Sequence, residues 1–267
     1  TLSQKRQRSS GAMPQDMSSI KREISNLRKQ DEKFRKIVEN DRSIKERIQR
    51  LIKEGYKRAD FRINPGGNMS ADFSLRFDRG NGSDIIRGRI ENGKVKSYEE
   101  ITPEDMDEMK KAIMKSSRIG DIVNSAKNSG FSLEKFDISP ENKNSAQFSI
   151  SMKREGREIS IEGSYENGTV KNRHLSGNGL NDFLLDRLNE NTQFRKLRTS
   201  LEMKGYNITS VKYNPEKNRV DVVFQGKNSE RDIVAQMNDD LTVKKITVKK
   251  KSQPWYLILL LLVLAHL

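Results

Sequence analysis

The sequence predicts an α+β protein of three tandem modules followed by a C-terminal apolar membrane segment. Each module is expected to contain two helices and then a three- to four-stranded antiparallel sheet. The first observation behind this is a spacing of glycines, because 130 − 55 and 205 − 130 both equal 75. The glycines are Gly55, Gly130 and Gly205, and the prolines Pro65, Pro140 and Pro215 share their period. A fixed period of this kind marks a repeated supersecondary unit.

Further positions match at the same spacing, and they predict what each module contains. Helix N-cap types recur as Asp41, Ser116 and Asn191. Apolar residues before the prolines recur as Ile63, Ile138 and Tyr213, and strand residues after them as Phe73, Phe148 and Val223. The predicted organisation is therefore a disordered basic tail (1–17), three modules (18–101, 102–177 and 178–249), and a basic flank with a membrane anchor, which is complete or cut short (250–267).

Composition agrees with small modules that have thin cores. Hydrophobic and charged residues each make up 33% of the 267 residues, which is polar for a single large core. The formal charge of +14 comes from 51 Lys and Arg against 37 acids, and it allows an acidic partner such as anionic lipid or nucleic acid. Cysteine is absent, which excludes disulfides, thiol catalysis and zinc–thiolate sites.

The first predicted helix, 18–39, carries an apolar stripe at alternating steps of three and four residues. Its members are Ile20, Ile24, Leu27, Phe34 and Val38, and Asp31 fills the one gap. The stripe is typical of a helix that packs on its own module, and the alternative is oligomerisation through an intermolecular coil. A second amphipathic helix follows with Ile44, Ile48, Leu51 and Ile52, and it ends at Gly55.

Helices open the second and third modules too. Thr102 and Pro103 are the expected cap and first position of one helix, and its early acids suit the helix dipole. The segment "LNDFLLDRLNE" places Leu180, Phe183, Leu184 and Leu188 on one side of another helix.

Alternating apolar residues then predict half-buried strands in every module. The segments "ADFSLRF" and "AQFSISM" place Phe73, Leu75 and Phe77, and Phe148, Ile150 and Met152, on one face. In "RVDVVF" the buried set is either Val220, Val222 and Phe224 or the face of Val223. Asn-Gly turns, which need positive φ at both central residues, reverse the chain before the last strand of the first two modules. The third module has lost about two residues there, and the Asn-Gly turn with them.

These hairpins, "ENGKVK" and "ENGTVK", resemble the end of a PepSY-type module. The matching positions are Asn92, Gly93 and Val95, then Asn167, Gly168 and Val170, with only Val243 in the third module. The leading helices depart from the family pattern, and an Asn-Gly turn before Val is common hairpin chemistry. The resemblance implies a non-catalytic module, often membrane-associated or exported, that binds or restrains another protein.

The C-terminal segment predicts attachment to a membrane. The 13 residues from Trp255 to Leu267 are uncharged and would span about 20 Å as a helix, less than a full crossing. A removable lipid-anchor signal and a buried core helix are the alternatives. The expected anchor residues are Trp255, Tyr256, Leu257, Ile258, Leu259, Leu260, Leu261, Leu262, Val263 and Leu264. The flank that would bind anionic lipid is Lys244, Lys245, Lys249, Lys250 and Lys251.

Two signals in the sequence point to opposite sides of the membrane for the modules. Positive flanks favour the cytoplasmic face. The start at Thr1 instead of Met indicates a removed segment or a fragment, and removal would favour export.

No catalytic, cofactor or metal motif appears. His174 stands in a link between modules, and one histidine without cysteine does not make a metal site. "SGNGLND" leads into a helix without a preceding nucleotide-binding strand, so it is interpreted as an N-cap turn. The acids of "EEITPEDMDEM" are explained by a helix N-terminus, although a paired-carboxylate glycosidase stays open on composition alone.

The expected function is therefore non-enzymatic binding or scaffolding at a membrane, with an unidentified protein partner and no cofactor. One alternative is an accessory region of a larger membrane protein or enzyme that continues past residue 267. The other is nucleic-acid binding, which the acidic helices after the first two sheets disfavour because a duplex-RNA module needs a basic helix there.

Overall fold

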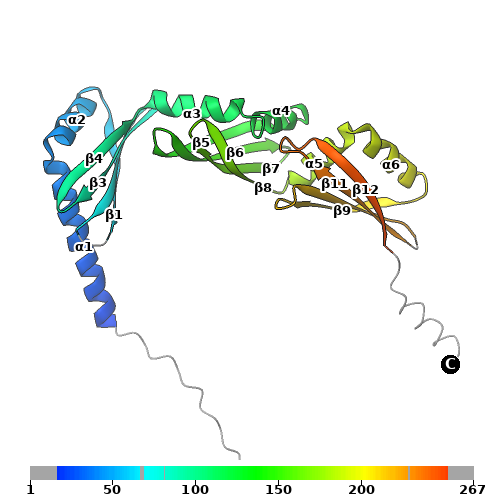
Figure 1. Cartoon of the computed structure of the whole chain (residues 1–267), viewed down its shortest axis with the longest axis horizontal. Coiled ribbons are helices and arrows are strands. Elements are labelled where there is room, and N and C mark those ends of the chain that lie inside the picture. The colour runs from blue at the N-terminus through cyan, green and yellow to red at the C-terminus, as the bar shows by residue number, and fades with distance from the viewer. Residues whose placement is uncertain (1–16, 67–68, 81, 228, 252–267) are drawn as a thin grey trace, which may run out of the picture. The chain divides into compact units, whose positions relative to one another are not determined.

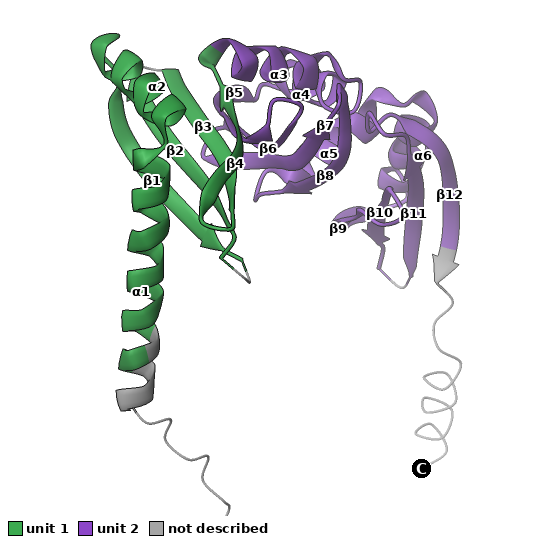
Figure 2. Ribbon diagram, turned by 60° about the vertical axis from the view of Figure 1, so that its left-hand side comes forward, with its two compact units in different colours: residues 1–103 green, residues 104–267 purple. Residues whose placement is uncertain are grey.

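The computed structural model describes residues 17–66, 69–80, 82–227 and 229–251. The chain divides into two compact units, Thr1–Pro103 and Glu104–Leu267 (Figure 2). Among the described residues there are six helices and three four-stranded sheets, and each sheet is an antiparallel meander (Figure 1). The fold is therefore α+β, as the sequence predicts.

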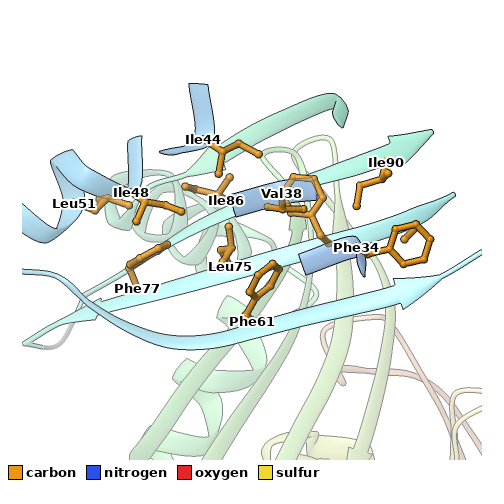
Figure 3. Packing of buried hydrophobic residues seen from close by; sticks show 12 residues of the cluster. Phe34, Val38, Ile44, Ile48, Leu51, Phe61, Leu75, Phe77, Ile86 and Ile90 are labelled. Carbon is orange, nitrogen blue, oxygen red and sulfur yellow. The ribbon is translucent and has the colours of Figure 1, made fainter. Parts of the chain in front are cut away.

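Unit 1 has two helices on one face of its sheet. Its elements are α1 (Met17–Asn40), α2 (Arg42–Lys53), β1 (Lys57–Pro65), β2 (Ala71–Arg79), β3 (Gly82–Glu91) and β4 (Lys94–Ile101). Figure 3 shows Val38 of α1 and Ile48 of α2 above Leu75 and Phe77 of the sheet, with Phe34 of α1 at the other side of the core from Ile48. These side chains form one core cluster, which also includes the predicted Ile44 and Leu51.

Unit 2 contains two such assemblies in succession. The first is α3 (Pro103–Lys115), α4 (Gly120–Asn128), β5 (Ser132–Asn142), β6 (Ser145–Arg154), β7 (Arg157–Glu166) and β8 (Thr169–Ser176). The second is α5 (Leu180–Glu190), α6 (Thr192–Glu202), β9 (Asn207–Asn214), β10 (Arg219–Gln225), β11 (Glu230–Met237) and β12 (Val243–Lys251). Helix α3 begins at the predicted Pro103, which is the last residue of unit 1.

The three periodic glycines end three helices in the same way. Gly55, Gly130 and Gly205 have φ of +89°, +85° and +80°, the left-handed region in which a Cβ is unfavourable. The amide of the residue after each glycine donates to the carbonyl five positions earlier, as from Tyr56 to Leu51 (2.9 Å). This is the Schellman motif, which satisfies carbonyls that the helix leaves unpaired. The predicted helix stops are confirmed.

The Asn-Gly turns are confirmed as structural. Asn92 and Gly93 have φ of +52° and +73°, and Asn167 and Gly168 have +48° and +82°, as a two-residue hairpin of this type requires. In the third assembly a longer turn replaces them, and its buried Leu241 adopts φ of +62°.

A close contact that the period did not predict also recurs. Gly88 on β3 lies opposite Phe73 on β2, and a Cβ on that glycine would come within 2.3 Å of the Ser97 carbonyl and 2.6 Å of the Phe73 ring. Gly163 lies opposite Phe148 with the same 2.6 Å approach. The third sheet pairs Ala235 with the smaller Val220 at this point. The smaller side chain opposite leaves room for the methyl group of alanine.

Three sequence expectations were wrong in detail. Val223 is not the equivalent of Phe148. In the second sheet Phe136 pairs with Ile150, and its counterpart one period later, Val211, pairs with Val222 instead of residue 225. Val220, Val222 and Phe224 form the buried set of that strand, because it is offset by three residues from the period.

The second error is Ser116, which does not cap α4. Ser116 begins a turn, and α4 starts at Gly120 after Ile119 without a side-chain cap. Ile52 of α2 is exposed instead of buried.

The predicted disordered tail and the predicted membrane anchor are not tested by the structure. Tail residues 1–16 and the apolar segment 252–267 lie outside the described residues, so the predicted anchor, Trp255 to Leu264, stays a prediction. Within the described part of the chain, no helix has the length and apolar character needed to cross a membrane.

Candidate functional site

The predicted basic flank lies on the last strand of the third sheet. Lys244, Lys245 and Lys249 are exposed on β12, which is an edge strand in the order β12-β11-β10-β9. Lys250 and Lys251 belong to the same strand, although their side chains fall outside the described part. The flank predicted to start at residue 250 is thus continuous with the sheet, since the strand ladder runs to Lys251.

Strand register decides where these lysines point. Ile246 lies opposite Ala235, which is buried, so Lys245 and Lys249 project from the opposite face of the sheet. A register irregularity next to Lys244 interrupts the alternation there. Asp232 lies directly across from Lys249, so its carboxylate offsets part of the positive charge of the strand.

Edge protection is a structural explanation for the same lysines. An edge strand exposes unpaired backbone groups that could pair with another chain, and charged side chains, especially lysine, discourage that pairing. This role and lipid binding are compatible, so the charge alone does not separate them.

A second basic surface lies on α6 of the same assembly, and the sequence analysis missed it. One exposed face of this helix, together with the two residues that follow its end, borders a shallow hollow of about 850 Å³. The lining residues are Thr192, Arg195, Lys196, Thr199, Ser200, Met203 and Lys204. Met203 is 84% exposed. Arg198 does not line this hollow, and it pairs with Glu202 at 2.7 Å. The signal available in the sequence was slight, because Arg195 and Lys196 are adjacent and Lys204 follows eight residues later.

Unit 1 contains a buried ionic cluster between α2 and its sheet. Arg47 of α2 donates to the Asp84 carboxylate of β3 at 3.2 Å and also to Glu100 of β4. Glu54 lies 3.8 Å from the same guanidinium. Asp84 is only 2% exposed, and one of its carboxylate oxygens has no hydrogen-bond partner. One cation thus faces two carboxylates inside the helix–sheet contact.

The electrostatics of this cluster keep a proton near neutral pH. The pKa of the Asp84 carboxyl is raised to about 7, first by burial and then by the charge and hydrogen bond of Glu100, while Arg47 acts to lower it. Burial acts to lower the pKa of Arg47, but the pKa is raised because the hydrogen bond and charge of Glu100, with the charges of Asp84 and Glu54, outweigh that effect. Glycoside hydrolysis needs an open cleft between two carboxyl groups, and this pair is covered by α2. The cluster is therefore a structural contact.

A polar junction ties the two assemblies of unit 2 together. The Arg118 guanidinium donates to Asp239 at 2.8 Å and to the backbone carbonyls of Val170 (3.3 Å) and Lys171 (3.1 Å). A cleft of about 570 Å³ beside it is bordered by the turn after α3, the Asn-Gly hairpin at Gly168 and the turn before β12. The hairpin that the sequence singled out therefore serves as a packing element here.

The other residues considered in the sequence have structural positions. His174 is exposed on β8, across from Glu162. Gly177 of "SGNGLND" has φ of +109°, and a Cβ there would meet the Glu158 carbonyl at 2.1 Å, so this segment is a tight packing turn. No described cluster of three or more His, Asp and Glu side chains is placed to hold a metal ion.

Comparison with known proteins adds little to this geometry. No protein-family model and no curated protein matches the chain. A solved structure of a candidate lipoprotein from Clostridium difficile 630 is 12% identical over 52% of this chain and 98% of its own, with a TM-score of 0.18. The C-terminal domain of YpeB from Bacillus megaterium is 13% identical over 80% of this chain and 98% of its own, with a TM-score of 0.17. Scores this low carry no argument about function.

Proposed function

We propose that this chain is a non-enzymatic binding protein that presents α+β modules at a membrane surface. In this proposal the apolar segment that begins at Trp255 anchors the chain, and the lysines of β12 hold the third sheet against anionic headgroups. The PepSY resemblance supports a module that binds another protein instead of catalysing a reaction. The partner is a protein, and neither a cofactor nor nucleic acid is involved.

The observation that carries the proposal is the short connection between sheet and anchor. The ladder of β12 with β11 extends to Lys251, opposite Glu230. Only Ser252, Gln253 and Pro254 separate it from Trp255, so four Cα steps span at most about 15 Å. A folded sheet with so short a connection would stay at the membrane surface when the anchor inserts.

Electrostatics would add to this attachment over a short range. A lysine near an anionic surface contributes about 1 kcal/mol, and the effect falls off within a Debye length of about 8 Å at physiological salt. A nine-residue strand is about 30 Å long. Lys249, Lys250 and Lys251, next to the anchor, would therefore contribute more than Lys244 and Lys245 if the strand stands upright on the membrane.

Vesicle flotation tests the two parts separately. The full chain should float with both neutral and anionic vesicles, because the apolar segment does not need charge. A chain that ends at Pro254 keeps every strand, and it should float with anionic vesicles at low salt, remain unbound to neutral ones, and be released by 1 M salt. Equal flotation of the shortened chain with both vesicle types would refute the role of the lysines, and a full chain that does not float would refute the anchor.

A further inference from the structure

The N-terminal part of α1 stands clear of the core of unit 1. Every described side chain from Lys21 to Gln30 is exposed, and Ile24 and Leu27 are 45% and 52% exposed. Burial begins further along the same helix, where Phe34 and Val38 enter the core. Figure 2 shows this part of α1 extending beyond the sheet of its own unit. We call it the α1 arm (residues 21–30).

The arm is held as a helix by contacts at its base. The Arg35 guanidinium donates to the Phe61 carbonyl at 2.6 Å and lies 4.6 Å from the centre of the Phe61 ring. Asp31 pairs with Arg35 at 2.8 Å, one turn nearer the arm. Because these contacts and the buried Phe34 fix the helix here, the arm extends an existing helix and avoids the unfavourable nucleation step. A partner would therefore meet a surface that is already ordered.

Residue spacing on the arm is that of a coiled-coil seam. Ile24 and Leu27 continue, in steps of three and four, the stripe that Phe34 and Val38 bury, so they take positions a and d of a heptad. The described part of the structure places nothing over Ile24 and Leu27. The seam stops at Asp31, which occupies the next core position and is paired with Arg35 inside its own chain.

The charges beside the seam favour a second copy of this helix in the parallel orientation. Lys21 and Arg28 both take position e, and an antiparallel pair would place them opposite each other, which is repulsive. A parallel pair instead sets Arg28 against position g of the other copy, where the sequence has Glu23. The same two helices attract in one orientation and repel in the other.

We propose that the α1 arm is a self-association surface, through which two copies of this chain pair in parallel along Ile24 and Leu27. The seam is shorter than the three to four heptads that a free-standing coil needs, so the pairing is weak in dilute solution. Attachment to a membrane would raise the local concentration of the arms and so increase the paired fraction. This increase rests on the proposed membrane function, whereas the pairing itself does not.

Disulfide trapping tests the proposal cleanly because the chain has no cysteine. Leu27→Cys places one thiol per chain on the seam, where a parallel pair brings the Cα atoms within about 6 Å. Ser25→Cys is the matched control, an almost isosteric change on the same helix but away from the seam. Under mild oxidation at high concentration, the Leu27→Cys chain should form a disulfide-linked dimer about tenfold faster than the Ser25→Cys chain. Adding Ile24→Asp should remove that advantage.

The orientation and the dependence on the membrane have their own readouts. In a mixture of Ile24→Cys and Leu27→Cys chains, the parallel pair predicts disulfides between like chains, and a predominance of mixed disulfides would overturn it. If the Leu27→Cys chain forms disulfides faster than the Ser25→Cys chain in solution but the protein does not float with vesicles, the pairing is supported and the membrane proposal is refuted. Faster disulfide formation by Leu27→Cys on vesicles alone supports both self-association and membrane attachment. Equal disulfide rates for Leu27→Cys and Ser25→Cys, both in solution and on vesicles, would overturn self-association. If Ile24→Asp also weakened vesicle binding in that case, the face of Ile24 and Leu27 would be identified as a lipid-binding surface.

Discussion

Replacing Asp84 by asparagine should change how the stability of unit 1 depends on pH. The folded protein holds the pKa of this carboxyl at about 7, against an ordinary value of 3.8. Folding therefore favours the protonated form, and the stability that this confers is fully present below about pH 4. This contribution to the unfolding free energy is lost as the pH rises from about 4 to about 7, and it does not change further at higher pH.

The magnitude follows from the size of the shift. A difference of about three pKa units at about 1.4 kcal/mol per unit gives about 4 kcal/mol of unfolding free energy between pH 4 and pH 8. Asparagine keeps the shape of the side chain and an oxygen that can accept from Arg47, but it does not ionise. The Asp84→Asn chain should match the parent near pH 4 and be more stable by up to about 4 kcal/mol at pH 8.

The assay must report on unit 1 alone. Urea unfolding can be followed by a short hydrogen-exchange pulse at fixed pH, with mass spectrometry of peptides from β3 and β4. The parent midpoint should fall between pH 4 and pH 7, and the Asp84→Asn midpoint should lack that fall.

Asp78→Asn is the control with the opposite sign. The pKa of Asp78 is lowered because hydrogen bonds from Ser83 and Arg76 outweigh the effect of burial. The stability from Asp78 is therefore present above pH 4 and lost as the pH falls through the lowered pKa. Identical pH profiles for the parent and Asp84→Asn would refute the account of the cluster.

Three further substitutions test the fold, each by its unfolding midpoint in urea. Gly163→Ala should destabilise unit 2 by about 1–3 kcal/mol because the new methyl meets the Asn172 backbone carbonyl at 2.3 Å and the Phe148 ring at 2.6 Å, and adding Phe148→Val should relieve only the contact with the ring; a neutral Gly163→Ala would contradict these contacts. Gly205→Ala should cost about 1 kcal/mol because its φ is +80°, and a stabilised variant would argue against the helix-end motif. Arg118→Ala should lower the stability of unit 2 by about 1–3 kcal/mol through its bonds to Asp239 and the β8 carbonyls, and an unchanged midpoint would show that this junction adds nothing.

The period of the sequence predicts much of the fold because it reports backbone requirements. Gly55 and the Asn-Gly turn at Asn92 need positive φ, a local property that a residue type can encode by itself. The same period misplaced Val223, because the third sheet is offset by three residues, an odd number that moves the buried set to the other alternate positions of the strand. The alternation in "RVDVVF" allowed either face, and only the pairing with the neighbouring strand decides between them.

The candidate sites were less accessible to sequence reasoning. Arg47 lies 37 residues from Asp84 and 53 from Glu100, and no local pattern indicates that the fold brings them together. The lysines of β12 were visible as a cluster, but only strand register shows that Lys249 faces Asp232. For α1, the heptad spacing was visible, whereas only the structure shows that burial begins at Phe34 and leaves Ile24 and Leu27 exposed.

The most direct test of membrane attachment through the basic edge strand compares two lysine pairs of the third assembly. In the chain that ends at Pro254, Lys249→Gln with Lys250→Gln should lower partitioning onto anionic vesicles at low salt about 30-fold, from about 1 kcal/mol per lysine. The control, Lys212→Gln with Lys217→Gln, removes the same charge from β9 and from the turn that follows it, and it should have little effect. Equal losses in the two variants, or no loss in either, would contradict the account.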